Sequence, residues 1–321
     1  MRRGRRFPLK FGHFRSTIPY GRRVWSGDVW VASPQALEPA EIALPATAGL
    51  PPAPLAPDRA QQVRDAIVCG DVLDVLARLP RRSVHLIVTS PPYNLEKPYA
   101  EHDDDLEDRA YLAWMRKVWA ACQGVLVPGG RLCVNIGENK RQYISNPHYS
   151  AFIQQLVDLR MLYRGTIIWN KHSAAKHCAW GSWKSPSNPH LVPRHEYIIV
   201  FSKGQWKLEG DPEGVDISPE EFMACTRSVW EFGTESRTRI GHPAPFPEKL
   251  PERLIKFLSF RGQTVLDPFA GSGTVGLVAA RLGRHFILGD NSPAYCRLAQ
   301  KRITHELGLS HQPRIIPVEE L

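Results

Sequence analysis

The stretch Gln263–Thr274 reads QTVLDPFAGSGT and decides the fold. An apolar strand pattern ends at Asp267, a glycine turn follows, and helical spacing begins at about Thr274. A strand, a tight turn and a helix in this order are typical of an open α/β sheet, in which ligands bind at the carboxyl ends of strands. Gly271 and Gly273 would let the backbone approach a ligand closely, and the helix N-terminus would offer free N–H groups.

This glycine turn is compatible with more than one ligand. It lacks the G-K-[ST] ending of a P-loop, but Gly271, Gly273 and Gly276 match G-x-G-x-x-G. A dinucleotide site of an NAD-type oxidoreductase is therefore an alternative, as is a turn that binds nothing. Asp267 favours S-adenosylmethionine, because a strand-tip carboxylate can bind its ammonium group but would lie poorly beside a pyrophosphate. Asp290, which ends the next strand, would accept hydrogen bonds from the ribose hydroxyls of either cofactor.

A second turn, Ser90-Pro91-Pro92-Tyr93, follows the strongly apolar run SVHLIVT. Its two prolines fix φ and remove two N–H donors, which leaves a stiff turn whose carbonyls can accept hydrogen bonds. Ser90 Oγ and a proline carbonyl can take the two protons of an exocyclic amine, and Tyr93 offers a ring on which a flipped base can stack. In a chain with 28 prolines, such a turn by itself is often only a rigid connection.

The remainder of the chain alternates between strand and helix patterns. Candidate strands cover residues 66–69, 83–89, 131–136, 166–169, 197–201, 264–266 and 285–288, and candidate helices cover residues 72–79, 108–127, 149–159, 251–259 and 275–282. This alternation predicts a mostly parallel sheet that is covered by helices.

Taken together, these stretches resemble the amino-methyltransferases of DNA in their permuted, β-class arrangement. In that family a [DNS]-P-P-[YFW] motif precedes the cofactor motif, as Ser90 precedes Asp267 here. The likeness covers roughly Gln61 to Leu307 and is carried by CGDVLDVLARLP, TSPPYN, LVPGGRLCVNIG, IIWNK, GSWKSPSNP, RHEYIIVFSKG, GHPAPFPEKLPERLI, DPFAGSGT and GDNSPAY. The resemblance implies an α/β fold with a doubly wound, mostly parallel, seven-stranded Rossmann-like sheet and a circularly permuted order of motifs.

The resemblance also implies roles for individual residues. The methionine end of S-adenosylmethionine would be held by Asp267, Phe269, Gly271, Ser272, Gly273 and Thr274. Asp290 would hold the ribose and Asp71 the adenine end, while Pro243, Pro245 and Phe246 would pack over the cofactor. The target amine would be held by Ser90, Pro91, Pro92 and Tyr93.

The expected reaction is an in-line transfer, in which the amine lone pair attacks the sulfonium methyl group and a proton then leaves. Such a transfer depends on positioning and on fixed dipoles, with neither an enzyme nucleophile nor a metal, and the target base must leave the duplex stack. Adenine-N6 members of the family usually carry Asp or Asn at the position of Ser90, and cytosine-N4 members usually carry Ser. The resemblance therefore favours cytosine N4, with adenine N6 as the alternative.

The formal net charge of +9 suggests a polyanionic partner, with DNA first and a membrane surface second. An inert basic surface would give the same charge. Residues 171–241 are expected to include the target-recognition loops, in which the candidate DNA-binding residues are Lys171, Lys176, Trp183 and Lys184. An inert DNA-binding module is a third hypothesis, and an RNA or protein amine is a further possible substrate. A homodimer and a companion restriction endonuclease are additional expectations.

Residues 1–60 differ from the rest of the chain. Basic and aromatic residues alternate before Asp28, and residues 33–60 are rich in Pro and Ala. We expect a partly disordered basic arm and linker here, followed by a catalytic domain over residues 61–321. Cys69 and Cys133 lie in apolar runs typical of reduced core cysteines, and no apolar run is long enough to span a membrane. These features predict a cytoplasmic, nucleoid-associated enzyme.

Overall fold

The computed structural model describes residues 63–93, 107–141, 144–171, 181–182, 184–191, 193–234 and 247–321. The predicted basic arm and linker over residues 1–60 lie outside these ranges. None of the helices in the described part of the chain is both long and apolar enough to cross a membrane.

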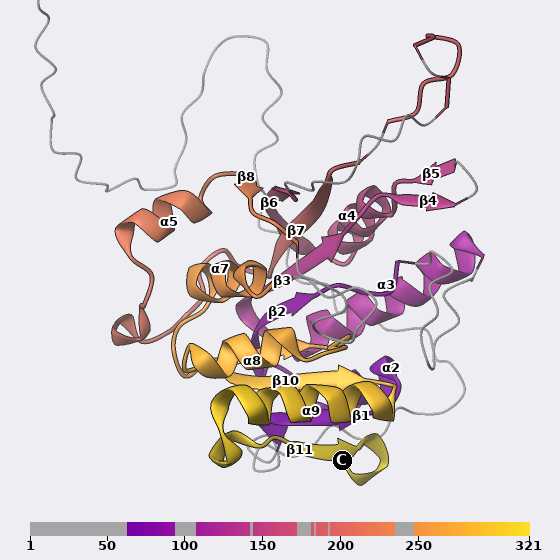
Figure 1. Cartoon of the computed structure of the whole chain (residues 1–321). Helices are drawn as coiled ribbons and strands as arrows, with labels where there is room; N and C mark the ends of the chain where they lie inside the picture. The colour runs from indigo at the N-terminus through magenta and orange to yellow at the C-terminus, as the bar shows by residue number, and fades with distance from the viewer. Residues whose placement is uncertain are drawn as a thin grey trace, which may run out of the picture. The chain divides into compact units, whose positions relative to one another are not determined.

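One large sheet organises the described residues (Figure 1). Its strands are β1 (Ala66–Cys69), β2 (Val84–Thr89), β3 (Leu126–Ile136), β6 (Met161–Asn170), β7 (His195–Lys203), β8 (Val229–Glu231), β9 (Thr264–Asp267), β10 (His285–Asp290) and β11 (Arg314–Pro317). Their order is β11-β1-β10-β9-β2-β3-β7-β6-β8, and all neighbours are parallel except that β7 runs antiparallel to β3 and β6. The mostly parallel α/β sheet expected from the sequence is confirmed. The seven expected strands occupy its inner positions, and β8 and β11 each add a strand at an edge.

Helices cover both faces of this sheet, so the doubly wound arrangement is also confirmed. One face carries α2 (Val72–Arg78), α3 (Asp108–Val125) and α4 (His148–Asp158), and the other carries α5 (Pro219–Cys225), α7 (Lys249–Leu258), α8 (Thr274–Arg281) and α9 (Pro293–Leu307). A two-stranded ribbon of β4 (Asn139–Arg141) and β5 (Ile144–Asn146) and three short 3₁₀ turns, at Pro212–Gly214, Leu309–His311 and Val318–Glu320, complete the described elements.

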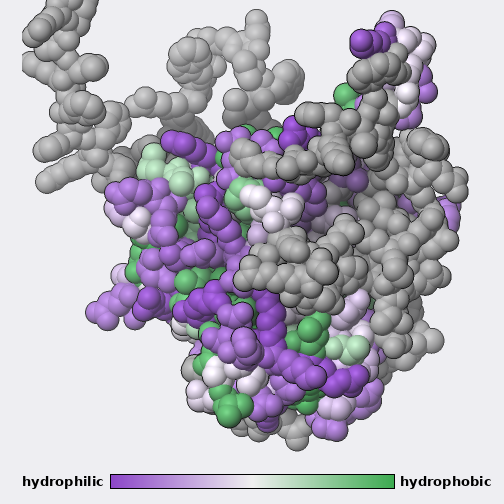
Figure 2. All heavy atoms as spheres, viewed as in Figure 1, coloured by the Kyte–Doolittle hydropathy of each residue, from purple (hydrophilic) through white to green (hydrophobic). Residues whose placement is uncertain are grey.

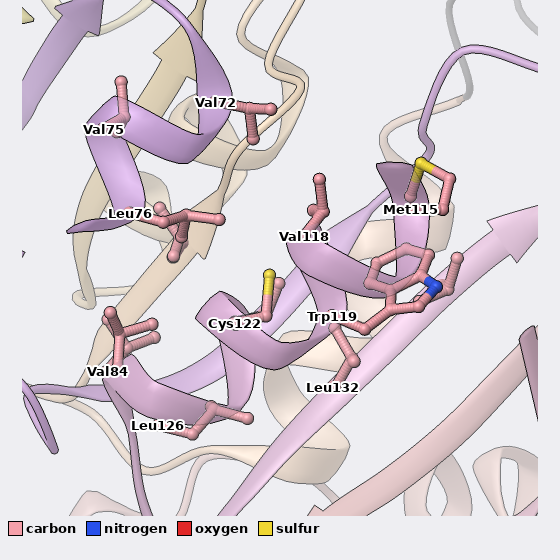
Figure 3. Packing of buried hydrophobic residues seen from close by; sticks show 14 of the residues in the cluster. Val72, Val75, Leu76, Val84, Met115, Val118, Trp119, Cys122, Leu126 and Leu132 are labelled. Carbon is pink, nitrogen blue, oxygen red and sulfur yellow. The ribbon is translucent and has the colours of Figure 1, made fainter. Parts of the chain in front are cut away.

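The helix α3 shows how the sequence builds one of these layers. Tyr111, Met115, Val118 and Cys122 follow one another at intervals of three or four residues, and all four are fully buried. This spacing places them on one helix face, which packs on the sheet and on α2. Figure 3 shows Leu76 of α2 opposite Val118 and Cys122 in the same cluster.

The opposite layer is amphipathic in the same way. Cys296, Ala299 and Ile303 form the buried stripe of α9, while Arg297 and Lys301 on the same helix are exposed. Figure 2 shows that hydrophilic side chains predominate on the described part of the face in view, with hydrophobic residues in separate spots.

The strand β3 begins five residues earlier than the predicted start at Arg131. The run Pro128-Gly129-Gly130 does not interrupt β3 but coincides with a shift in the register of its pairing with β2. Gly129 has φ of +74°, and a Cβ atom there would lie 1.9 Å from the carbonyl oxygen of Lys207. Only glycine suits this position, and the strand continues through it.

The two predicted motifs meet at the centre of the sheet. The strands β9 and β2 are parallel neighbours, with Leu86 beside Val265 and Ile87 beside Leu266. From β9 the chain proceeds through α8 to β10 on one side, whereas from β2 it proceeds through α3 to β3 on the other. This divergence makes the β9–β2 boundary the topological switch point, where open α/β sheets bind their ligands.

A buried ion pair lies near the starts of β9 and β10, at the end of these strands opposite to Asp267 and Asp290. The Arg284 side chain is fully buried, and its guanidinium forks around the carboxylate of Asp216, with Nη2 2.7 Å from Oδ1. The same guanidinium donates to the carbonyls of Ser259 and Leu282. It therefore ties the segment before α5 to the strands β9 and β10.

We expect Asp216→Asn to destabilise the protein by about 3–5 kcal/mol, because it leaves the buried Arg284 charge without its carboxylate. The matched control is Asp158→Asn, which breaks the exposed pair with Arg116 and should cost at most about 1 kcal/mol. Urea denaturation followed by circular dichroism measures both. Equal unfolding midpoints for the two variants would show that the buried pair has no special weight.

Candidate active site

The two motifs are joined by a direct hydrogen bond at the switch point. Asp267 ends β9 and is 1% exposed, and its Oδ1 accepts from the hydroxyl of Thr89 at 2.7 Å and from the N–H of Phe269 at 3.1 Å. Thr89 ends β2 and directly precedes Ser90. This hydrogen bond therefore joins the start of the turn predicted to hold the amine, Ser90–Tyr93 (the amine turn), to the start of the turn predicted to hold the cofactor, Asp267–Thr274 (the cofactor turn).

Asp267 is a buried acid that has no salt-bridge partner among the described residues. Burial, together with the nearby charge of Asp290, raises the pKa of Asp267 to about 7, although the hydrogen bonds from Thr89 and Phe269 lower it. A carboxylate in such a position is stabilised when a cation arrives beside it. The site thus fits a ligand with an ammonium group, and the predicted contact of Asp267 with that group stays a prediction.

The glycine turn is held by the second predicted acid, Asp290. Its Oδ2 accepts from the N–H of Gly271 at 2.8 Å and its Oδ1 from the N–H of Ser292 at 2.9 Å, and burial raises its pKa. Gly273, with φ of +75°, directly precedes α8, and a Cβ atom there would lie 2.7 Å from the Cβ of Ala299. Each carboxylate oxygen of Asp290 retains a lone pair for a ligand hydroxyl.

The Ser272 and Thr274 hydroxyls have a protein partner that the sequence did not reveal. Both are buried, and Arg302 of α9 donates to them, at 3.4 Å and 2.8 Å from Nη1. The same guanidinium binds Glu248, which directly precedes α7, at 2.8 Å. The side chains of Ser272 and Thr274 therefore lock the turn, and their predicted contact with the cofactor stays a prediction.

Asp71 lies two strands away from Asp267 along the same edge of the sheet. It follows β1, is exposed, and caps α2 by accepting from the N–H of Leu73 at 2.8 Å. The N–H of Gly70 donates to the Asp290 carbonyl at 2.9 Å, which fixes β1 against β10. The three predicted acids thus stand at the ends of three adjacent strands, β1, β10 and β9.

Several polar groups of the turn from Ser90 to Tyr93 form hydrogen bonds within the protein. The hydroxyl of Tyr111 donates to the carbonyl of Pro92 at 2.7 Å, which uses one of the two lone pairs of this oxygen. Pro91 is buried, and within the described ranges its carbonyl accepts no hydrogen bond. Ser90 Oγ donates to the hydroxyl of Tyr93 at 3.0 Å, and the Tyr93 ring packs against the core on the side of α3 and α4.

Two further residues from neighbouring strands contact Tyr93. Asn135 of β3 donates to the Tyr93 oxygen at 3.0 Å and to Glu196 Oε2 at 2.6 Å. Glu196 of β7 lies 3.3 Å from the Tyr93 hydroxyl and accepts from Lys171 Nζ at 2.6 Å. The run RHEYIIVFSKG contains Glu196, but its strand pattern alone did not separate this acid from an ordinary solvated residue.

The structure describes two of the four residues that are predicted to contact DNA, Lys171 and Lys184. Lys171 binds Glu196, and its ammonium lies 5.8 Å from the centre of the Trp169 ring. Lys184 is exposed. The remaining predicted residues of the recognition and cofactor-covering loops, Lys176, Trp183, Pro243, Pro245 and Phe246, lie outside the described ranges. All of these roles stay predictions.

The described part of the chain has no group of three or more His, Cys, Asp or Glu residues placed to hold a metal ion. The acids and hydroxyls of this site can bind a cationic ligand and form hydrogen bonds with a polar substrate.

Known proteins resemble this chain in both amino-acid sequence and fold. Residues 84–301 match the family model described as DNA methylase. The type II methyltransferase M.HpaI of Haemophilus parainfluenzae is 30% identical over 250 residues, which cover 75% of this chain and 74% of that protein. M.MjaVI of Methanocaldococcus jannaschii is 37% identical over 174 residues, which cover 54% of this chain and 88% of that protein.

Solved structures give the same picture. TTHA0409 of Thermus thermophilus, in its complex with S-adenosyl-L-methionine, has a TM-score of 0.64 and 30% identity, covering 78% of this chain and 98% of that one. The cytosine-N4-specific PvuII DNA methyltransferase has a TM-score of 0.59 and 22% identity, covering 78% and 94%. The second likeness concerns the fold alone.

Asp267→Asn should separate stability from binding. A carboxyl whose pKa is raised from 3.8 to about 7 contributes stability that is fully present below pH 3.8 and is lost as the pH rises through 7. We therefore expect the ligand-free Asn variant to melt above the wild type at pH 8, with a smaller difference at pH 5. Its affinity for S-adenosylmethionine, the cofactor expected from the sequence, should fall at least about tenfold at pH 8.

Thermal melting at the two pH values and calorimetric titration measure these effects. Unchanged affinity together with a pH-independent change in melting temperature would mean that Asp267 does not face the cofactor. The control is Asp74→Asn, which alters an exposed acid of α2 and should leave both quantities unchanged.

Arg302→Met should loosen the glycine turn, because it removes the donor to Ser272 and Thr274. We expect cofactor affinity to fall about tenfold, which corresponds to about 1.4 kcal/mol. Lys301→Met, at the exposed neighbouring position, is the control and should bind as the wild type does. If both variants bind equally well, the contact of Arg302 with the turn has no role in binding.

Proposed function

The chain belongs to the DNA methylase family, and from this premise we propose that it methylates N4 of cytosine at specific sites in double-stranded DNA. It is a DNA amino-methyltransferase, and its cofactor is S-adenosylmethionine. The observation that carries the proposal for the site is the hydrogen bond from Thr89 to Asp267, because it brings the turn at Ser90 beside the buried carboxylate.

In the proposed site, the residues of the chain divide the work of binding. Asp267 holds the ammonium of the methionine end, Asp290 the ribose hydroxyls and Asp71 the adenine end. The bound cofactor supplies an electrophilic methyl group on a sulfonium sulfur. Because Asp267 and Ser90 follow adjacent strand ends, the methyl group and the target amine are held close together, which removes much of the entropic cost of their encounter.

The turn residues orient the target amine. Ser90 Oγ and the carbonyl of Pro91 accept its two protons, which leaves the nitrogen lone pair directed at the methyl group. The Pro92 carbonyl accepts from Tyr111 and has no assigned role at the amine. The ring of Tyr93 supports the base once it has left the stack.

Cytosine N4 is preferred because position 90 is Ser, the residue usual in the N4 members of the family, whereas Asp or Asn is usual in the N6 members. Lys171, Lys176, Trp183 and Lys184 are the proposed DNA contacts, within recognition loops over residues 171–241. A second copy of the chain and a companion restriction endonuclease are the proposed protein partners.

The base is identified by expressing the protein in cells without other DNA methylation, digesting their DNA to nucleosides and analysing these by mass spectrometry. We expect N4-methylcytosine. In vitro, Ser90→Ala should lower the methylation rate about 100-fold, because it removes a group that contacts the reacting amine. Ser150→Ala, at an exposed hydroxyl on α4, is the control.

N6-methyladenine as the sole product would overturn the choice of cytosine and retain the reaction type. DNA without any new methylated base would contradict the whole assignment. Full activity of Ser90→Ala would show that the amine binds elsewhere.

A further inference from the structure

Glu196 is a carboxylate of β7 that no step of the reaction above uses. Its side chain is 14% exposed and contacts Tyr93 of the turn. The strand β7 adjoins β3, and β3 adjoins β2 (Figure 1). Its two oxygens have different partners. Oε2 faces Tyr93 and Asn135, and Oε1 accepts from Lys171 at 2.6 Å.

We propose that Ser90, Tyr93 and Glu196 form a proton relay that carries the proton released by the methylated amine from Ser90 Oγ through the Tyr93 hydroxyl to Glu196 Oε2. This inference rests on the proposed function, since Ser90 must be the residue that contacts the amine. Glu196 touches neither substrate nor cofactor, and it acts through Tyr93 as a positioning residue and terminal proton acceptor.

The directions of the hydrogen bonds carry the argument. The Tyr93 oxygen accepts from Ser90 Oγ at 3.0 Å and from Asn135 Nδ2 at 3.0 Å, which uses both of its lone pairs. Its own proton must then be donated. Among the described residues, Glu196 Oε2 at 3.3 Å and the backbone carbonyl of Asn135 at 3.4 Å can accept it. Of these, the carboxylate is the stronger acceptor and the one that can keep a proton.

The surroundings of Glu196 fix it in this position. Asn135 is 3% exposed and donates to Glu196 and Tyr93 with the same amide nitrogen, so it holds the two groups together. Lys171 balances the carboxylate charge and is itself packed over Trp169. Because the Lys171 and Glu196 side chains are partly exposed, a proton that reaches Glu196 can return to solvent.

The step balances in atoms and in charge. The bond between nitrogen and the methyl carbon forms as the bond between sulfur and that carbon breaks. The amine proton passes to Ser90 Oγ, the Ser90 proton to the Tyr93 oxygen and the Tyr93 proton to Glu196. A sulfonium and a carboxylate are consumed, and a neutral thioether, a neutral methylamine and a carboxylic acid are formed.

The test compares Glu196→Gln and Tyr93→Phe with the wild type in single-turnover methylation of unmethylated genomic DNA by labelled S-adenosylmethionine. Each variant keeps the shape of its side chain and interrupts the relay at a different point. We expect each to lower the single-turnover rate about 100-fold, while the affinities for cofactor and DNA change less than threefold. Glu209→Gln, at an exposed carboxylate, is the control and should keep the wild-type rate.

Two further proteins distinguish a relay from a merely structural contact. The double variant should be no slower than the slower single variant, because both changes interrupt one chain of groups. Glu196→Asp, which restores a carboxylate, should recover at least about tenfold of the rate lost in Glu196→Gln.

The proposal is overturned if Glu196→Gln or Tyr93→Phe keeps the wild-type rate, if the loss lies entirely in binding, or if Glu196→Asp gives no recovery. Should Glu196→Gln fail to fold, as judged by its thermal melt, Tyr93→Phe alone decides by the same criteria. Failure of the proposed function itself is distinguished by the wild-type protein, which would then transfer no label to DNA.

Discussion

The site depends on a single constraint, the burial of the Asp267 carboxyl at the end of β9 with a hydroxyl from β2 as its nearest donor. Removing a carboxylate from water costs free energy unless hydrogen bonds or a cation replace the lost solvation. Here the hydrogen bonds from Thr89 and Phe269 replace part of the lost solvation, and the raised pKa of Asp267 reflects the part that is not replaced. The free protein therefore holds an incompletely compensated acid, and its proposed partner is the ammonium group of the cofactor.

This constraint also explains why the permuted order of the motifs does not disturb the site. Thr89 and Asp267 are 178 residues apart in the chain, yet they follow adjacent parallel strands. Geometry at the switch point depends on which strands are neighbours and in which direction they run, not on the order in which the chain visits them. The amine turn can thus precede the cofactor turn in sequence while both open toward the same edge of the sheet.

The features that were predictable from the sequence are those written in short, local patterns. The strand ends at Asp267 and Asp290 and the glycine positions between them belong to this class. The contact of Arg302 with Thr274 does not, because it depends on how α9 packs against the turn. The same holds for Glu196, whose partners Tyr93, Asn135 and Lys171 come from three other segments of the chain. The edge strands β8 and β11 are short and partly exposed, so they lack the continuous apolar run that marks a buried strand.

The distribution of charge changes the meaning of the basic composition. A net charge of +9 pointed to DNA, but the acids Asp71, Asp267 and Asp290 lie at the ends of β1, β9 and β10. Two cations near the site, Lys171 and Arg302, bind Glu196 and Glu248. An acidic centre suits a reaction that begins with a cationic sulfonium and ends with a free proton. In the proposed site, Asp267 cannot distinguish the cofactor from its product, since both carry the ammonium group. The charge that changes during the reaction lies at the sulfur and at the amine. Among the described carboxylates, Glu196 is the one that hydrogen bonds through Tyr93 connect to the turn Ser90–Tyr93.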